Sequence, residues 1–169
     1  VKFFRDEPRE LTITAVVAPE GDGPDLLARC ALISHRQLPG QPGPTATTHF
    51  TGRVRLSAQD PEPTQQEVPP EQGVPLAADL IYRFYFHGPA YQVVDAAWAT
   101  SVGSAARMTR GLPDNHVPAQ APLVSAPRLL ELCFQTAGLW EAGRHSRLAL
   151  PQHVHRARVV GNPENAAEP

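Results

Sequence analysis

Residues 125–141 have the sequence Ser-Ala-Pro-Arg-Leu-Leu-Glu-Leu-Cys-Phe-Gln-Thr-Ala-Gly-Leu-Trp-Glu, and this stretch decides the fold. It predicts one long helix, with Ser125 as the N-cap, Pro127 in the first turn and Gly143 as the stop. A helix with no wide polar stripe is buried on most of its sides. The apolar side chains surround the axis: Leu129, Leu130, Leu132, Cys133, Phe134, Ala137, Leu139 and Trp140.

Two polar residues interrupt this helix. Glu131 and Gln135 are four residues apart, so they share one face. A carboxylate among apolar side chains is costly unless it is paired, and a protonated carboxyl in such a place is what a general acid requires. A buried polar residue that serves only the fold is the commoner case, so the helix alone favours the structural interpretation.

The composition excludes several classes of protein. A chain of 169 residues suits one domain, and its net charge of −2 gives no basic surface for nucleic acid. Two cysteines do not make a disulfide scaffold, and we expect Cys30 and Cys133 to be reduced core residues. No signal peptide and no apolar run of membrane-spanning length is present, so we expect a cytoplasmic protein without a membrane contact.

Proline divides the chain into three parts. Eight of the 19 prolines cluster at 39–44 and 61–75, where interior strand and helix are excluded. We therefore expect a strand-rich part over 1–56, a Pro-rich linker over 57–76 and a third part over 77–169.

The first part predicts an antiparallel meander. Apolar and polar residues alternate over 10–17, and further strands are expected over 26–34 and 49–56, with turn residues between them. Three strands without a second layer bury too little apolar area to be stable alone.

The third part combines strands with the helix. We expect a strand over 92–99, a weak strand or loop as far as Met108, and another strand over 148–160. The tail from 162 to 169 is typical of disorder. His116 is expected at the surface, and His49 is left open between burial and exposure.

His153 and His155 would share a face of the last predicted strand. A metal pair is one interpretation, but no third ligand is evident, so a solvated strand face is favoured.

Two motifs carry a family resemblance. His87-Gly88-Pro89-Ala90-Tyr91-Gln92 resembles a Tyr-Gly-Pro-x-Phe-Gln segment, and residues 126–135 resemble a His-Pro-x-Leu-Leu-Asp-x-x-x-(His or Gln) segment. Their order and separation fit the dehydratase domain of a modular, iterative or polyunsaturated-fatty-acid-type polyketide synthase. Residues 49–54, His-Phe-Thr-Gly-Arg-Val, are similar to the strand that closes the first half of such domains.

The resemblance implies an α+β double hotdog, in which each half wraps an antiparallel sheet around a long central helix. Residues 1–56 would be the closing strands of the first hotdog and 77–169 the second, with its central helix at about 125–141. The family's first catalytic motif, His-x-x-x-Gly-x-x-x-x-Pro, would lie upstream of Val1. On this interpretation the catalytic histidine is outside this segment, which alone would be inactive.

The resemblance also implies a reaction, which is the elimination of water from a carrier-bound 3-hydroxyacyl thioester to give a 2-enoyl thioester. Glu131 would be the acid and Gln135 its helper. Where the family usually has Asp, Glu131 adds one methylene, and a misplacement of about 1 Å can cost about a hundredfold in rate. The implied substrate-binding residues are His87, Gly88, Pro89 and Tyr91.

No metal or cofactor is implied, because the substrate is carried on the phosphopantetheine of an acyl carrier protein. The implied partners are that carrier protein, other domains of the synthase and a second copy in a homodimer. The alternative is a non-catalytic hotdog module that scaffolds or dimerises a megasynthase. A hotdog thioesterase is a weaker option, since such enzymes also place a carboxylate on the central helix.

Overall fold

The computed structural model describes most of the chain in two parts. Contacts divide the chain into two compact units, Val1–Asp60 and Pro61–Pro169, and the boundary falls inside the predicted linker 57–76. Much of that linker and the predicted disordered tail lie outside the described residues. These residues are 8, 10–37, 39–59, 62, 70–71, 73–119, 121, 123 and 125–160.

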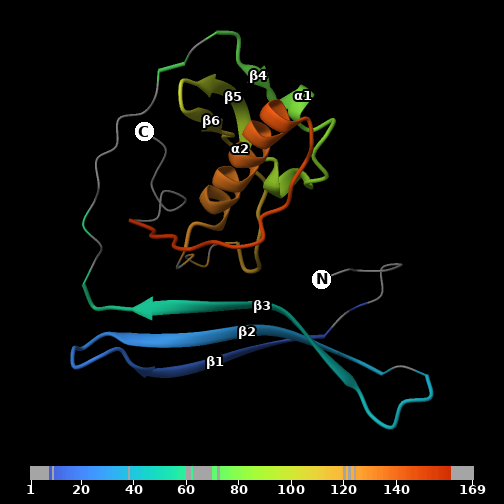
Figure 1. The fold of residues 1–169 in the computed structure, drawn as a ribbon, viewed down its shortest axis with the longest axis vertical. Helices are drawn as coiled ribbons and strands as arrows, with labels where there is room; N and C mark the ends of the chain where they lie inside the picture. The colour runs from blue at the N-terminus through green and yellow to red at the C-terminus, as the bar shows by residue number, and fades with distance from the viewer. Residues whose placement is uncertain are drawn as a thin grey trace. The chain divides into compact units, whose positions relative to one another are not determined.

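The first unit is an antiparallel sheet of three strands in the order β1-β2-β3 (Figure 1). Its strands are β1 (Leu11–Pro19), β2 (Leu26–Arg36) and β3 (Thr45–Leu56). The predicted meander is therefore confirmed, although β3 begins four residues earlier than expected. His49 is the extra residue of a β-bulge, because Leu32 pairs with Phe50 while Ile33 pairs with Thr48.

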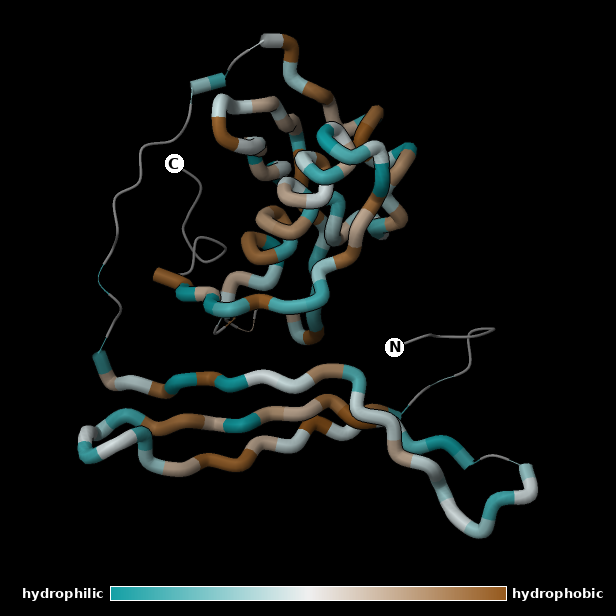
Figure 2. Tube along the Cα trace, viewed as in Figure 1, coloured by the Kyte–Doolittle hydropathy of each residue, from teal (hydrophilic) through white to brown (hydrophobic). Residues whose placement is uncertain are grey.

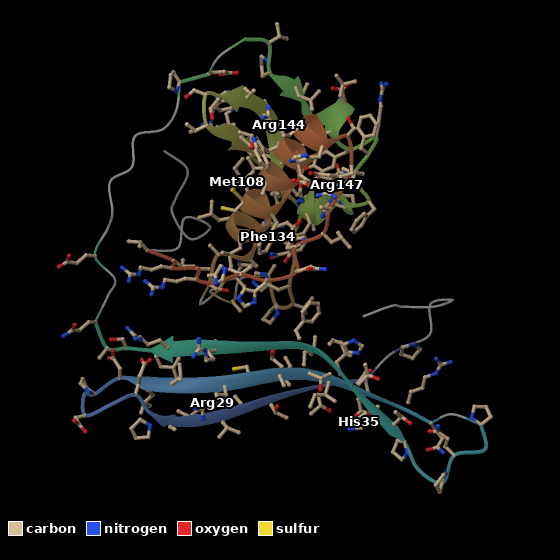
Figure 3. The ribbon with its side chains drawn as sticks, in the orientation of Figure 1. Arg29, His35, Met108, Phe134, Arg144 and Arg147 are labelled. Atoms are coloured by element: carbon tan, nitrogen blue, oxygen red, sulfur yellow. The ribbon has the colours of Figure 1, made fainter. Side chains whose placement is uncertain are left out.

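One face of this sheet carries most of the apolar residues of its three strands, which Figure 2 shows in brown along the backbone. Directly opposed residues of antiparallel strands share a face, and the pairing places Ile13 of β1 beside Leu32 of β2 and Leu32 beside Phe50 of β3. Ile13 is 76% exposed and Phe50 64% exposed. No described residue of this unit forms a helix that could cover the face. The opposite face is more polar, with Arg29 of β2 on it (Figure 3).

The second unit packs one long helix on a small sheet (Figure 1). Its strands are antiparallel in the order β4-β5-β6. The elements are β4 (Leu76–Ala77), α1 (Ala78–Ile81), the 3-10 helix η1 (Pro89–Tyr91), β5 (Val94–Thr100), β6 (Gly103–Met108) and α2 (Pro127–His145). An antiparallel sheet with one long helix is compatible with a hotdog half. The region expected to be a weak strand or loop forms β6.

The core of this unit is small. It consists of Ile81, Val93, Val94, Ala97 and Leu132, with partly buried side chains such as Tyr82 and Tyr85 packed against it. Figure 3 shows Phe134 on α2 and Met108 at the end of β6. Val93 and Val94 are fully buried, so the start of β5 is held rigidly beneath the helix.

The helix predicted over 125–141 exists, but its ends differ from the prediction. Ala126, which has no capping side chain, occupies the N-cap position in place of Ser125, and Pro127 begins the helix as expected. Gly143 does not stop the helix. The helix ends at His145, and Ser146 adopts a left-handed conformation with φ of 53° while its N–H bonds to the Ala142 carbonyl.

The prediction that this helix is buried on most sides is wrong. Leu132 and Gln135 are its buried residues, and Trp140 is exposed. Cys133 is also exposed and Cys30 is half-buried, so neither is the core residue that was expected. The small sheet covers one side of α2, and the apolar residues of its other side have no described cover.

The strand predicted over 148–160 is also wrong, because none of these residues forms a strand. Pro151 lies in the middle of the alternating pattern and has no N–H to donate to a sheet. None of the described helices has the length and apolar character needed to cross a membrane.

Candidate functional site

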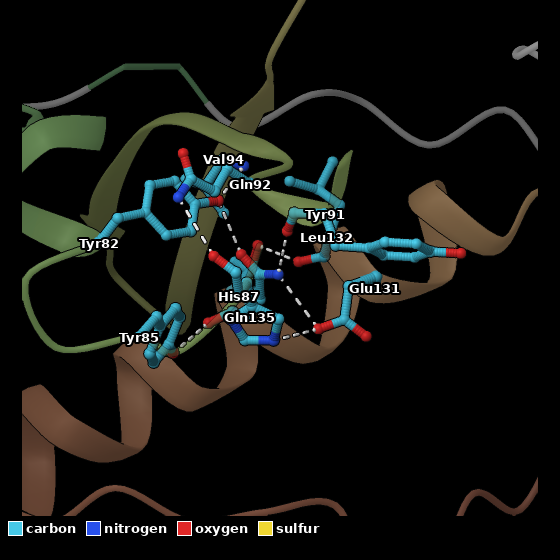
Figure 4. A network of polar contacts seen from close by, with 10 residues as sticks. Tyr82, Tyr85, His87, Tyr91, Gln92, Val94, Glu131, Leu132 and Gln135 are labelled. Atoms are coloured by element: carbon cyan, nitrogen blue, oxygen red, sulfur yellow. Dashed lines mark hydrogen bonds and ion pairs between the residues drawn. The ribbon is translucent and has the colours of Figure 1, made fainter. Parts of the chain in front are cut away.

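Glu131 and His87 meet at the centre of the candidate site (Figure 4). Glu131 lies on α2, and His87 lies in the loop between α1 and η1. The His87 Nε2 and Glu131 Oε1 atoms are 2.9 Å apart, and their side chains are 18% and 25% exposed. Partial burial strengthens this contact relative to a surface ion pair, which is screened by water.

Gln135 links the same carboxylate to the protein interior. Its side-chain amide Nε2 donates to Glu131 Oε1 at 3.1 Å and to the Tyr91 carbonyl at 2.9 Å. Its Oε1 accepts from the Tyr82 hydroxyl at 2.8 Å, and the residue is only 2% exposed. The prediction that Glu131 and Gln135 share one helix face is therefore confirmed.

Two tyrosines complete the network from the side of α1. The Tyr82 hydroxyl accepts from the Val94 N–H at 2.7 Å, and the Tyr85 hydroxyl donates to the Gln135 carbonyl at 2.8 Å. Burial raises the pKa of Tyr82, while the hydrogen bond from Val94 lowers it and the charge of Glu131 raises it. Burial, with Tyr82 and Glu131 adding to it, raises the pKa of Tyr85 to about 12. Both phenols are neutral near pH 7 and can donate hydrogen bonds.

The His87 ring is held on two sides by aromatic neighbours. The Phe86 ring stacks on it with centroids 4.8 Å apart, and the Tyr85 ring meets it edge-on at 5.4 Å. The His87 carbonyl accepts from the Gln92 side chain at 3.1 Å. His87 Nδ1 is buried and has no hydrogen-bond partner among the described residues. The orientation therefore points Nε2 at Glu131 and turns the other nitrogen away from solvent.

Gly88, Pro89 and Tyr91 form a tight turn beside His87. The Tyr91 N–H donates to the Gly88 carbonyl at 2.9 Å, which closes the 3-10 turn of η1. The Tyr91 carbonyl bonds Gln135 rather than solvent, and its hydroxyl accepts from Asn115 at 3.4 Å. The turn thus places its backbone against the Gln135 side chain, and a role of the turn's side chains in binding substrate remains a prediction.

Four other histidines make contacts of their own. His116 is half-buried rather than at the surface, since its ring bonds Asn115 Oδ1 at 2.7 Å and the Ala121 carbonyl at 2.9 Å. His49 is half-buried in the first unit, with Nε2 at 2.7 Å from Ser34 Oγ. The exposed rings of His153 and His155 lie 4.7 Å apart by centroid.

The described part of the chain contains no group of three or more residues that could hold a metal ion.

Sequence reasoning missed the two tyrosines and the contact between His87 and Glu131. The i, i+4 spacing on α2 indicates the Gln135 contact, because a helix fixes that distance. No comparable rule connects His87 or Tyr82 to α2, since these residues are separated from it by a long stretch of chain.

Comparison with known families agrees with the motifs. A family model described as the polyketide synthase dehydratase N-terminal domain matches residues 56–169, which is more than half of the chain. No curated protein and no solved structure was found to match. The matched residues include all of the second unit's described elements and the whole cluster around Glu131. The chain belongs to the polyketide synthase dehydratase family.

Proposed function

We propose that Glu131 is the acid of a dehydratase that eliminates water from a 3-hydroxyacyl thioester held on an acyl carrier protein. The family membership supports a dehydratase in general terms. The observation that carries the specific proposal is the pair of contacts on one carboxylate oxygen. Both the His87 and Gln135 contacts end on Glu131 Oε1, which leaves Oε2 as the oxygen that can carry the acid's proton.

Each bond that forms in this elimination is matched by a bond that breaks. A histidine base removes the proton from the α-carbon, and those two electrons form the carbon–carbon double bond as the bond to the hydroxyl oxygen breaks. Glu131 Oε2 gives its proton to that oxygen, which leaves as water. The carboxylate that remains is stabilised by the N–H of Gln135 and by Nε2–H of His87, so both donors act most strongly where negative charge develops.

His87 is not placed to act as the base in this proposal. Its Nε2 faces Glu131, and its Nδ1 is buried, so neither nitrogen is open to the α-carbon of a substrate. We therefore assign the base to the histidine motif that the resemblance places upstream of Val1. His87 would instead fix the orientation of the Glu131 carboxyl while Gly88, Pro89 and Tyr91 line the bound acyl chain.

The proposal includes the wider setting that the motif resemblance implies. The second unit would be the second hotdog of a double hotdog, and residues 1–56 would close the first. The protein would work in the cytoplasm as a homodimer beside other synthase domains. Apart from the phosphopantetheine arm that presents the substrate, this elimination of water requires no cofactor.

The reverse reaction gives a direct test. The full-length protein is incubated with a 2-enoyl pantetheine thioester, and hydration is followed by the loss of enoyl absorbance. Glu131→Gln should lower the rate by about 10²–10⁴-fold, the usual contribution of a general acid. Glu141→Gln is the matched control, because Glu141 is on the same helix but bonds Arg147 away from the cluster.

Three outcomes separate the interpretations. Loss of hydration in Glu131→Gln but not in Glu141→Gln supports the assignment. A Glu131→Gln variant with the wild-type rate refutes it. A full-length wild-type protein that hydrates nothing favours the non-catalytic scaffold module.

A further inference from the structure

The amide of Gln135 is bonded at both of its ends, and this fixes which end faces the carboxylate. At one end Oε1 meets the Tyr82 hydroxyl at 2.8 Å. At the other end Nε2 lies 2.9 Å from the Tyr91 carbonyl and 3.1 Å from Glu131 Oε1. Because the residue is 2% exposed, water has little access to replace these partners.

The direction of each bond follows from main-chain groups that have only one role. The Val94 N–H can only donate, so the Tyr82 oxygen accepts from it and sends its own hydrogen to Gln135 Oε1. The Tyr91 carbonyl can only accept, so it requires Nε2 at the opposite end. The two anchors demand the same orientation of the amide. The second hydrogen on Nε2 is thereby directed at Glu131 Oε1 (Figure 4).

We infer that Tyr82 is a positioning residue for the dehydratase acid, acting through the Gln135 amide to hold the Glu131 carboxyl. This inference rests on the proposed function of Glu131. Tyr82 does not touch Glu131 Oε1, which is bonded by His87 and Gln135. The Tyr82 hydroxyl connects the fully buried start of β5 to Gln135 on α2. The position of the Glu131 carboxyl is therefore set by the sheet as well as by its own helix.

Ser104 of β6 supplies a control outside the cluster. It is half-buried like Tyr82, and its hydroxyl also bonds α2, donating to the Thr136 carbonyl at 2.9 Å. That bond ends on the main chain of the neighbouring residue and not on the side-chain amide of Gln135. Removing the Ser104 hydroxyl therefore leaves the orientation of the amide unchanged.

The experiment compares Tyr82→Phe with Ser104→Ala by two measurements. The first is hydrogen exchange of the Gln135 side-chain amide, followed by NMR of selectively ¹⁵N-labelled protein. The second is kcat and KM for hydration of the enoyl thioester by the full-length protein. Loss of one hydrogen bond from the amide corresponds to about a tenfold effect. We expect exchange to be about tenfold faster and kcat about tenfold lower in Tyr82→Phe, with KM within about twofold of the wild type. Ser104→Ala should change neither exchange nor kcat.

Wild-type exchange and kcat in Tyr82→Phe overturn the inference, and so do equal changes in both variants. If Tyr82→Phe does not fold, 3-fluorotyrosine at position 82 keeps the ring and the hydroxyl. Fluorination lowers the pKa of the phenol, so at an alkaline pH the fluorinated ring is ionised and donates no hydrogen while the unsubstituted Tyr82 still does. The Gln135 amide must then exchange faster in the fluorinated protein than in the unsubstituted protein at the same pH, and equal rates overturn the inference. The exchange measurement requires no turnover. A wild-type protein without hydration activity therefore defeats the proposed function, while the exchange rates still decide the role of Tyr82.

Discussion

Gly138 lies where α2 passes closest to Tyr85, and replacing it with alanine tests that packing. A Cβ atom at position 138 would lie 2.5 Å from the Tyr85 hydroxyl oxygen and 3.6 Å from the ring carbon that carries it. The first distance is far inside van der Waals contact, whereas the second is ordinary contact. The hydroxyl cannot simply turn aside, because the aromatic ring is rigid and the oxygen is bonded to the Gln135 carbonyl.

The magnitude follows from three effects. Alanine in place of glycine favours a helix by about 1 kcal/mol. Overpacking costs about 1–3 kcal/mol, and loss of the Tyr85 hydrogen bond costs about 1 kcal/mol. We therefore expect Gly138→Ala to lower the free energy of unfolding by about 2 kcal/mol. In a Tyr85→Phe background the clashing oxygen is absent, so the same substitution should raise that free energy by about 1 kcal/mol.

Urea unfolding of the wild type, both single variants and the double variant gives the coupling between the two positions. The expected coupling energy is about 3 kcal/mol, well above the few tenths found for independent sites. The reasoning is refuted if Gly138→Ala stabilises the protein with Tyr85 present, or if its effect is the same in both backgrounds.

Two further predictions concern a partly buried phenol and an exposed apolar face. Because the folded-state pKa of Tyr85 is raised to about 12 from an ordinary 10, its contribution to stability is complete below pH 10 and is lost as the pH rises through 12. Over that range the free energy of unfolding should fall more in the wild type than in Tyr85→Phe. Parallel curves of unfolding free energy against pH for the two proteins would contradict this. The exposed apolar face of the first unit should drive self-association, which light scattering measures. Ile13→Thr should weaken the self-association, while Val16→Thr, on the opposite face of β1, should not. Equal effects of the two variants would show that this face is not the contact.

The spacing of residues along the sequence predicts the features that lie within a single strand or helix. Alternation over 10–17 predicts β1, and the i, i+4 separation of Glu131 and Gln135 predicts their contact. Both follow from the geometry of a single element. The position of His87 against Glu131 depends on how the chain between them returns to α2, and no property of either residue encodes that path.

The failed predictions have a physical cause as well. The strand expected over 148–160 has suitable alternation, but a strand exists only with a partner, and Pro151 weakens the pairing further. Cys133 lies on an apolar helix and is nevertheless exposed, because burial depends on what packs against the helix and not on the helix alone. Ser125 is a favoured capping residue, yet Pro127 sets the first helical turn and leaves Ala126 at the cap.

The two main-chain anchors of the Gln135 amide have a consequence for how this site can diverge. The Tyr91 carbonyl persists whatever residue occupies position 91, and the Val94 N–H persists for every residue except proline at position 94. Substitutions that change the side chains at those positions therefore leave both anchors of the Gln135 amide in place. Tyr82 and Gln135 have no such freedom, because their side chains are the links themselves. Related chains can thus vary at positions 91 and 94 while keeping the contact between Gln135 and Glu131.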